Sequence, residues 1–433
     1  MSDVTHYTDT FGTFTGTTLS GKRMAERKEA MSRFVAAGFP TTRHEEWKYT
    51  NLAPVAAGRF LPAQVLPKTD AKAVKEFLVA GEDVHLFVFV NGFLSEGLSK
   101  PATLPSGVIA GRLSDHADHS AVRAHLGAVA GPAAGPLVDL NTAFLAEGAF
   151  LFVPASVKVE RPVHFLFIND TSAGPTMVSP RNLFVAEKGS DVKVIESFHT
   201  VGSSHHGFTN AVTEVHTGAD ACLDLTKVQL ENNLTYHIGF TAAAQQSRSE
   251  FHVNTMTLDG AIVRNNLEIH LLEEHCTAYL YGLYCLDGTQ LVDNHSLVDH
   301  AVPNCQSNEL YKGILDGKSQ GVFNGKILVR KDAQKTNAYQ SNKNILLSDD
   351  ASMNTKPQLE IFADDVKCSH GTTTGQMDEE ALFYLRSRGI GEQNARAFLN
   401  IAFAGDVIQK IAYEPLRSRL MELMERKLKG EKL

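Results

Sequence analysis

Hydrophobic and polar positions alternate in short runs between residues 151 and 359, which is the pattern of half-buried β-strands. Examples are Val157-Lys158-Val159 and Asp191-Val192-Lys193-Val194-Ile195. Over these roughly two hundred residues, apolar side chains do not recur at the three-to-four spacing of an amphipathic helix. We therefore predict a strand-rich core that has no helices between its strands.

The strand-rich region also repeats at intervals near 29 residues. Gly189 and Gly218 open similar segments one interval apart, and Cys276, Cys305 and Gln334 follow one another at the same spacing. One strand-bearing coil per repeat is typical of a β-solenoid, whereas propeller blades usually take about 40 residues or more. The repeat therefore predicts a β-solenoid.

The region before the core has a mixed, partly helical pattern. Ser20 is placed to cap a helix over residues 21–37. The apolar face of that helix would carry Met24, Met31, Phe34 and Val35. The apolar run Val84–Phe93 predicts a strand.

Helical patterns return after residue 372. Asp378 is placed to cap a helix with acidic residues in its first turn, and Pro415 suits the first turn of a last helix. Between them, a helix is expected to carry one apolar stripe formed by Ala395, Phe398, Leu399, Ala402 and Phe403. Three short helices make a thin layer, which must pack on the solenoid or on a partner. We predict three domains, 1–145, 146–372 and 373–433.

Composition limits the function classes. Hydrophobic residues make up 43% and charged residues 21% of the 433 positions, as in ordinary globular proteins. The net charge of −8 and the lack of a long Lys/Arg run argue against nucleic-acid binding. We find no signal peptide and no apolar run long enough to span a membrane. The five cysteines include no CxxC pair, so we expect a reduced, cytoplasmic protein.

Gly313–Ser319 is one residue too short for a nucleotide-binding P-loop. That loop also needs a following helix whose N-terminal amides bind phosphate, whereas Gln320–Ile327 has the pattern of a strand and a turn. We therefore expect no ATP hydrolysis by this chain.

The polar and sulfur-bearing side chains mostly favour structural interpretations. We interpret Trp47, inside the polar segment Arg43–Tyr49, as an anchor between that segment and the rest of the fold. Four cysteines lie in strand-rich segments, where core packing is the favoured role: Cys222, Cys276, Cys285 and Cys305.

Cys368-Ser369-His370 is the exception. In an extended segment, Cys368 and His370 project from one face, and a thiolate with an imidazole suits iron, zinc or an iron–sulfur centre. Two ligands do not complete such a site, so a second protein would have to supply the others. The alternative is that Cys368 packs and His370 bonds a backbone carbonyl.

Several segments together resemble the SufB/SufD family of iron–sulfur cluster assembly proteins. They are Arg43–Tyr49, Gly321–Lys326, Lys343–Ser348, Thr355–Ile361, Asp364–Gly371 and Leu382–Ile390. Gly371 follows His370 where SufB-like chains carry Glu, so the resemblance is to the SufD branch. The main sulfur-accepting and cluster-ligating cysteines of SufB-like chains find no confident match here.

The resemblance implies a right-handed parallel β-helix with helical ends, which would act as a non-ATPase scaffold subunit of a SufBCD-type complex. A SufB-like partner would share an interface where Cys368 and His370 help to hold a transient cluster or iron. A SufC-like ATPase would dock on the C-terminal helices, with candidate contacts at Leu382, Phe383, Phe398 and Phe403. The chain itself would bind no nucleotide, and it would form a homodimer when the partner is absent.

Two other function classes share a solenoid fold. A secreted β-helix polysaccharide lyase would present a groove of Asp, Arg and Lys, which is not evident in this sequence, and activity on polygalacturonate would identify it. A plain β-solenoid interaction module would have no metal chemistry. Loss of cluster assembly on mutation of Cys368 or His370 would separate the scaffold from that module.

Overall fold

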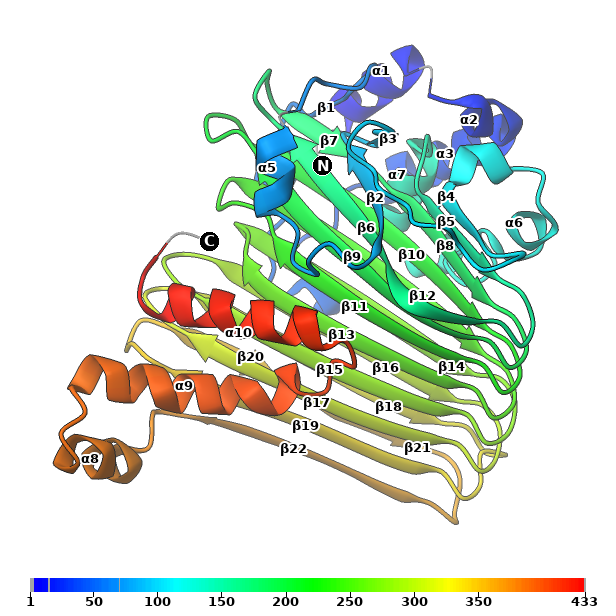
Figure 1. Cartoon of the computed structure of the whole chain (residues 1–433). Coiled ribbons are helices and arrows are strands. Elements are labelled where there is room, and N and C mark those ends of the chain that lie inside the picture. The colour runs from blue at the N-terminus through cyan, green and yellow to red at the C-terminus, as the bar shows by residue number, and fades with distance from the viewer. Residues whose placement is uncertain (1–3, 15, 70, 432–433) are drawn as a thin grey trace.

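The computed structural model describes residues 4–14, 16–69 and 71–431. Its largest part is a stack of parallel coils, with helices of the N-terminal region at one end and three C-terminal helices along one side (Figure 1). This confirms the predicted parallel β-helix with helical ends. Within the described residues, no helix combines the length and the apolar character needed to cross a membrane.

Each coil of the solenoid contributes one strand to each of two sheets, here named sheet A and sheet B. Sheet A contains, in spatial order, β4 (Ile109–Arg112), β5 (Ala149–Val153), β8 (Arg181–Ala186), β10 (Gly207–Thr217), β12 (Thr235–Gln245), β14 (Ile262–Leu271), β16 (Leu291–His300), β18 (Gln320–Val329) and β20 (Ser352–Thr355). Three short strands join its side: β1 (Leu61–Pro62), β7 (Thr176–Val178) and β21 (Gln358–Ile361).

Sheet B runs from the N-terminal region to the last coil. Its spatial order is β3 (Phe93–Leu94), β2 (His85–Val90), β6 (Lys158–Asp170), β9 (Asp191–Val201), β11 (Cys222–Leu230), β13 (Glu250–Asp259), β15 (Thr277–Leu286), β17 (Gln306–Leu315), β19 (Asn337–Leu346) and β22 (Lys367–Gly375). The predicted strand over Val84–Phe93 is therefore β2, followed by a tight return into β3.

The predicted 29-residue interval corresponds to one coil in part of the stack. Thr277 pairs with Gln306 in sheet B, so Cys276 and Cys305, which precede them, occupy equivalent positions. The next coil is longer, because Gln306 pairs with Asn337. Thr336, and not Gln334, is therefore the residue equivalent to Cys305.

Apolar and polar side chains share the solenoid interior. Phe165, Phe167, Phe184 and Phe198 stack within the early coils. Later coils bury Tyr284, Asn342 and Asn344, which hydrogen-bond one another. Inward-facing polar side chains must find partners inside the stack, because water does not reach them.

The N-terminal helices pack against sheet A, except for α5, which packs beside sheet B. They are α1 (Thr5–Thr13), α2 (Thr18–Lys22), α3 (Met24–Ala37), α4 (Ala53–Ala57), α5 (Ala71–Glu76), α6 (Ser120–His125) and α7 (Pro136–Ala143), with single 3-10 turns at Glu45–Trp47, Leu113–His116 and Pro132–Ala134. A shared core joins α3 and α7 to Phe208 and Ile238 of the solenoid.

The predicted helix over residues 21–37 is divided in the structure. Ser20 lies inside α2, where its hydroxyl donates to the Leu145 carbonyl, so it does not cap a single long helix. Val35 is 41% exposed, contrary to the predicted apolar face. The buried face of α3 instead includes Arg27 with Ala30, Met31 and Phe34, because α7 packs on that side.

Trp47 connects the N-terminal segment to the solenoid, as predicted. The Arg264 guanidinium of β14 lies 3.9 Å from the centre of the Trp47 ring, and Arg264 Nη1 donates to the Glu46 carbonyl over 2.6 Å. In addition, β2 of the N-terminal region is a strand of sheet B, and β4 is a strand of sheet A. The N-terminal region and the solenoid therefore share hydrogen-bonded sheets. The division into domains at residues 145 and 372 stays a prediction.

The C-terminal helices cover part of the outer face of sheet B (Figure 1). They are α8 (Glu379–Ser387), α9 (Glu392–Ile408) and α10 (Glu414–Leu428). Asp378 accepts hydrogen bonds from the amides of Glu380 and Ala381, and Pro415 lies in the first turn of α10, both as predicted. Leu416, Leu420, Leu423 and Met424 of α10 are buried against sheet B.

Candidate functional site at the open end of the solenoid

β22 is the last strand of sheet B and the free edge of the stack (Figure 1). Among the described residues it pairs only with β19, in parallel, from Lys367 to Gly375. All of its residues except Cys368 are exposed. A long edge strand leaves a row of backbone N–H and C=O groups without sheet partners, which is the usual template for adding another strand.

The register explains where the side chains of Cys368 and His370 lie. Cys368 pairs with Ala338 and His370 with Gln340, and both partners are buried side chains of β19. In-register parallel strands align side chains that face the same way. Cys368 and His370 therefore continue two interior rows, but no further coil covers them. The structure thus brings both predicted residues to one face at the open end.

The two donors differ in accessibility. Cys368 is half-buried and packs against a small apolar cluster that includes Ile327 and Ala338. Burial raises the pKa of the Cys368 thiol, against a smaller opposing effect of a hydrogen bond with the Ala338 backbone. His370 is exposed. The imidazole is therefore the donor that an incoming group reaches first.

A buried carboxyl, that of Glu309, lies two coils beneath His370. Gln340, which pairs with His370, donates from Nε2 to Glu309 Oε2 over 2.8 Å, and Ser296 donates to Glu309 Oε1 over 2.6 Å. Burial raises the pKa of Glu309 to about 7, although both hydrogen bonds oppose the rise. The interior below the open end therefore contains a proton-holding group that the sequence pattern did not predict.

Three of the four strand-region cysteines are buried, as predicted. The Cys276 and Cys305 thiols both donate to the Glu273 carbonyl, over 3.0 and 3.3 Å. Cys285 packs beneath the C-terminal helices. Gly313–Ser319 spans the end of β17 and the turn into β18, so no helix follows it.

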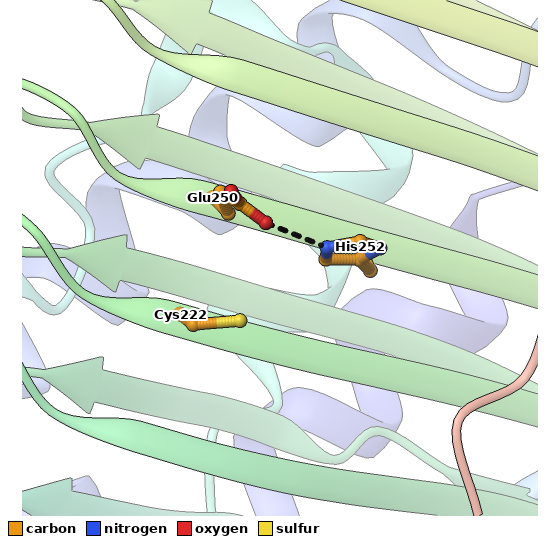
Figure 2. Close-up of side chains that lie close together, drawn as sticks. All are labelled: Cys222, Glu250 and His252. Atoms are coloured by element: carbon orange, nitrogen blue, oxygen red, sulfur yellow. Dashed lines mark hydrogen bonds and ion pairs between the residues drawn. The ribbon is translucent and has the colours of Figure 1, made fainter.

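Cys222 differs from the other three because it lies on the outer face of sheet B. It pairs with Glu250 on the next strand, and His252 lies two residues further on the same face. The Cys222 Sγ, a Glu250 carboxylate oxygen and a His252 ring nitrogen lie within 4.8 Å of one another (Figure 2). The prediction that Cys222 belongs to the core is therefore wrong, since its strand position points outward.

The four candidate docking residues fall into two groups. Leu382 is buried within the C-terminal layer, and Phe403 packs towards the solenoid with the Lys312 ammonium 4.2 Å from its ring centre. Phe383 and Phe398 are 73% and 54% exposed. The predicted stripe on α9 is therefore split, because sheet B lies under Ala404 and Val407 instead. Whether any of the four binds a partner stays a prediction.

Two family models together match most of the chain. The model described as "SUF system FeS cluster assembly, SufBD core domain" matches residues 167–403, and the "SufBD protein N-terminal region" matches residues 6–165. The chain therefore belongs to the SufBD family of iron–sulfur cluster assembly proteins.

Individual relatives show which branch of the family this chain resembles. The chain is 34% identical over 407 residues to an iron–sulfur cluster assembly SufBD family protein of Synechocystis, covering 92% of this chain and 89% of the relative. It is 30% identical over 415 residues to the iron–sulfur cluster assembly protein SufD of Escherichia coli, covering 94% of each. Bacillus subtilis SufD is 28% identical over 309 residues, or 68% of this chain and 67% of that protein. These matches confirm the predicted resemblance to SufD.

Proposed function

We propose that this chain is a non-ATPase, cytoplasmic scaffold subunit of a SufBCD-type complex that assembles iron–sulfur clusters. The observation that carries the proposal is the free edge of β22, with Cys368 and His370 facing the open end of the solenoid. A SufB-like partner pairs along this edge and builds the cluster in the interface. Without that partner, the same edge supports a homodimer.

The donor set at the edge fits a nascent cluster as cargo. Imidazole and thiolate both bind iron, yet two donors leave a site incomplete, so the partner contributes the others. His370 is the principal ligand because it is exposed, whereas the Cys368 thiol is half-buried and its pKa is raised. Membership of an iron–sulfur assembly family favours this role over a polysaccharide lyase or a plain interaction module.

Replacing His370 with alanine should leave subunit association intact and lower cluster content by about tenfold or more, because a ligand is lost while the backbone edge remains. The measurement compares co-purification of the partner with iron and sulfide content of the complex isolated from cells. Thr372→Ala is the matched control, since Thr372 lies two residues along the same exposed face. Normal cluster content in the His370→Ala complex would reject the ligand role.

We further propose that the exposed side of α8 and α9 docks a SufC-like ATPase. Phe383 and Phe398 are large exposed apolar side chains on these helices, and Leu382 supports them from within. Aromatic side chains of this kind often dominate binding energy at protein interfaces.

Phe383→Asp and Phe398→Asp should each weaken ATPase binding by about tenfold or more, because charge then replaces an aromatic contact. Both side chains are exposed, so helicity and the unfolding midpoint should stay unchanged. Val65→Asp is the matched control, because Val65 is also 73% exposed but lies in the N-terminal region. Wild-type affinity in both phenylalanine variants would contradict the docking assignment.

A further inference from the structure

A cysteine, a glutamate and a histidine, three types of side chain that bind metals, lie close together on the outer face of sheet B, away from the open end. Cys222 lies on β11, while Glu250 and His252 lie on β13 (Figure 2). Three further strands, β15, β17 and β19, separate β13 from the edge strand β22. The group is therefore distinct from the Cys368–His370 pair.

The backbone fixes the relative positions of these side chains. β11 and β13 pair in register from Cys222–Glu250 onward, so Cys222, Glu250 and His252 share a face. The turns that lead into the two strands are joined as well. Arg248 donates from Nε and Nη2 to the two carboxylate oxygens of Asp220, over 2.6 and 3.0 Å. Two rigid strands with joined turns supply the fixed scaffold that a metal site needs.

The side chains themselves are close to binding geometry. His252 Nε2 lies 3.3 Å from Glu250 Oε2, and the three ligand atoms lie within 4.8 Å of one another. Ligands bound to one Zn²⁺ at about 2.0–2.3 Å lie roughly 3.4–3.8 Å apart in a tetrahedral site. Glu250 is 54% exposed, so it can close the remaining distance by rotation. The Tyr279 ring stacks on His252, 4.6 Å away between centres, and steadies the imidazole.

We propose that Cys222, Glu250 and His252 form a binding site for a divalent transition-metal ion with tetrahedral preference, such as Zn²⁺. One thiolate, one imidazole and one carboxylate fill three positions, and a solvent water fills the fourth. On binding, the metal–sulfur bond replaces the S–H bond, and the thiol proton passes to water.

The surrounding charge favours a cation at this position. Asp191 flanks Cys222 on β9, and Asp224 pairs with His252 across β11 and β13. Lys193 is the opposing charge on the same face, opposite Asp224. These carboxylates attract a dication and stabilise it once it is bound.

The test is a titration of the full chain with Co²⁺, a spectroscopic substitute for Zn²⁺. It is carried out in a Cys368→Ser/His370→Ala background, which removes the other thiol–imidazole pair. We expect a thiolate-to-cobalt charge-transfer band together with the intense visible bands of tetrahedral Co²⁺, and displacement of both by Zn²⁺. Cys222→Ser should abolish the charge-transfer band and weaken Zn²⁺ binding by more than about 100-fold.

The controls separate the site from general surface binding. His252→Ala should also remove the tetrahedral bands. Glu250→Gln should have a smaller effect, because Glu250 is the most exposed of the three ligands. Thr277 pairs with Glu250 on the next strand, but it is not a proposed ligand. Thr277→Ala should therefore leave metal binding unchanged. All of these side chains lie on the outer face, so an unchanged unfolding midpoint checks the fold. A charge-transfer band that persists in Cys222→Ser, or none in the parent chain, would overturn the proposal.

Discussion

Replacing Arg264 with methionine should lower the free energy of unfolding by about 3–5 kcal/mol, because it leaves the buried Asp293 carboxylate without its arginine partner. The side chains of Arg264 and Asp293 are 2% and 1% exposed, and Nη1 donates to Oδ2 over 2.5 Å. Burial alone would raise the pKa of Asp293, but Arg264 and His295 outweigh it and hold that pKa well below its usual range.

The loss should appear first where Arg264 contacts the N-terminal segment. The same guanidinium covers the Trp47 ring and bonds the Glu46 carbonyl, and Thr50 donates to Asp293. Limited proteolysis of the Arg264→Met chain should therefore cut within residues 41–50 faster than in the wild type. Urea unfolding, followed by Trp47 fluorescence, measures the change in free energy.

Adding Asp293→Asn to Arg264→Met is the control that identifies the cause. If the cost arises from an unpaired buried charge, neutralising Asp293 should recover more than half of the lost stability, and the two substitutions will be non-additive. Equal or greater destabilisation in the double variant would show instead that lost packing against Trp47 dominates.

The solenoid could be predicted from sequence because its signal is repeated. Strands such as Asp191–Val201 alternate, and a missed boundary in one coil does not change the pattern of the next. Helix ends with a local chemical cause were also predictable, as at Asp378 and Pro415. Each depends on interactions within a few residues of chain, which the sequence displays directly.

Features that depend on packing between distant segments were not predictable in the same way. Val35 was assigned to a buried face, but the position of α7 decides which face of α3 is covered. Phe398 and Phe403 belong to one apolar stripe in sequence, and only the placement of α9 over sheet B separates them into exposed and half-buried residues.

The grouping of Cys222 with Glu250 depends on register. The two residues lie one coil apart, at an interval slightly shorter than the 29-residue repeat. Glu250 and His252 are also two residues apart on one face, which is the spacing of Cys368 and His370. That signal is present in the sequence. It becomes specific only once the paired strands show that Cys222 faces outward.

The contribution of Glu309 to wild-type stability should fall as the pH rises from about 5 to 7, and Glu309→Gln should remove that contribution. Burial raises the pKa of Glu309 from 4.5 to about 7. Between these values the folded chain holds a proton that the unfolded chain has released, so raising the pH favours unfolding. The stabilising contribution is complete below about pH 4.5 and is lost as the pH approaches 7. A shift of about 2.5 pKa units corresponds to about 3 kcal/mol.

The Glu309→Gln chain should therefore match the wild type near pH 5 and exceed its stability by about 3 kcal/mol near pH 8. The substituted amide is neutral throughout and still offers an oxygen to the Ser296 hydroxyl, which bonds Glu309 in the wild type. Urea unfolding midpoints at several pH values give the difference between the two chains, in which other titrating groups cancel. Glu29→Gln, at an exposed position of α3, should give a difference independent of pH. If the stability difference between Glu309→Gln and the wild type were also independent of pH, Glu309 would be ionised within the fold. The polar interior beneath His370 would then stabilise its charge.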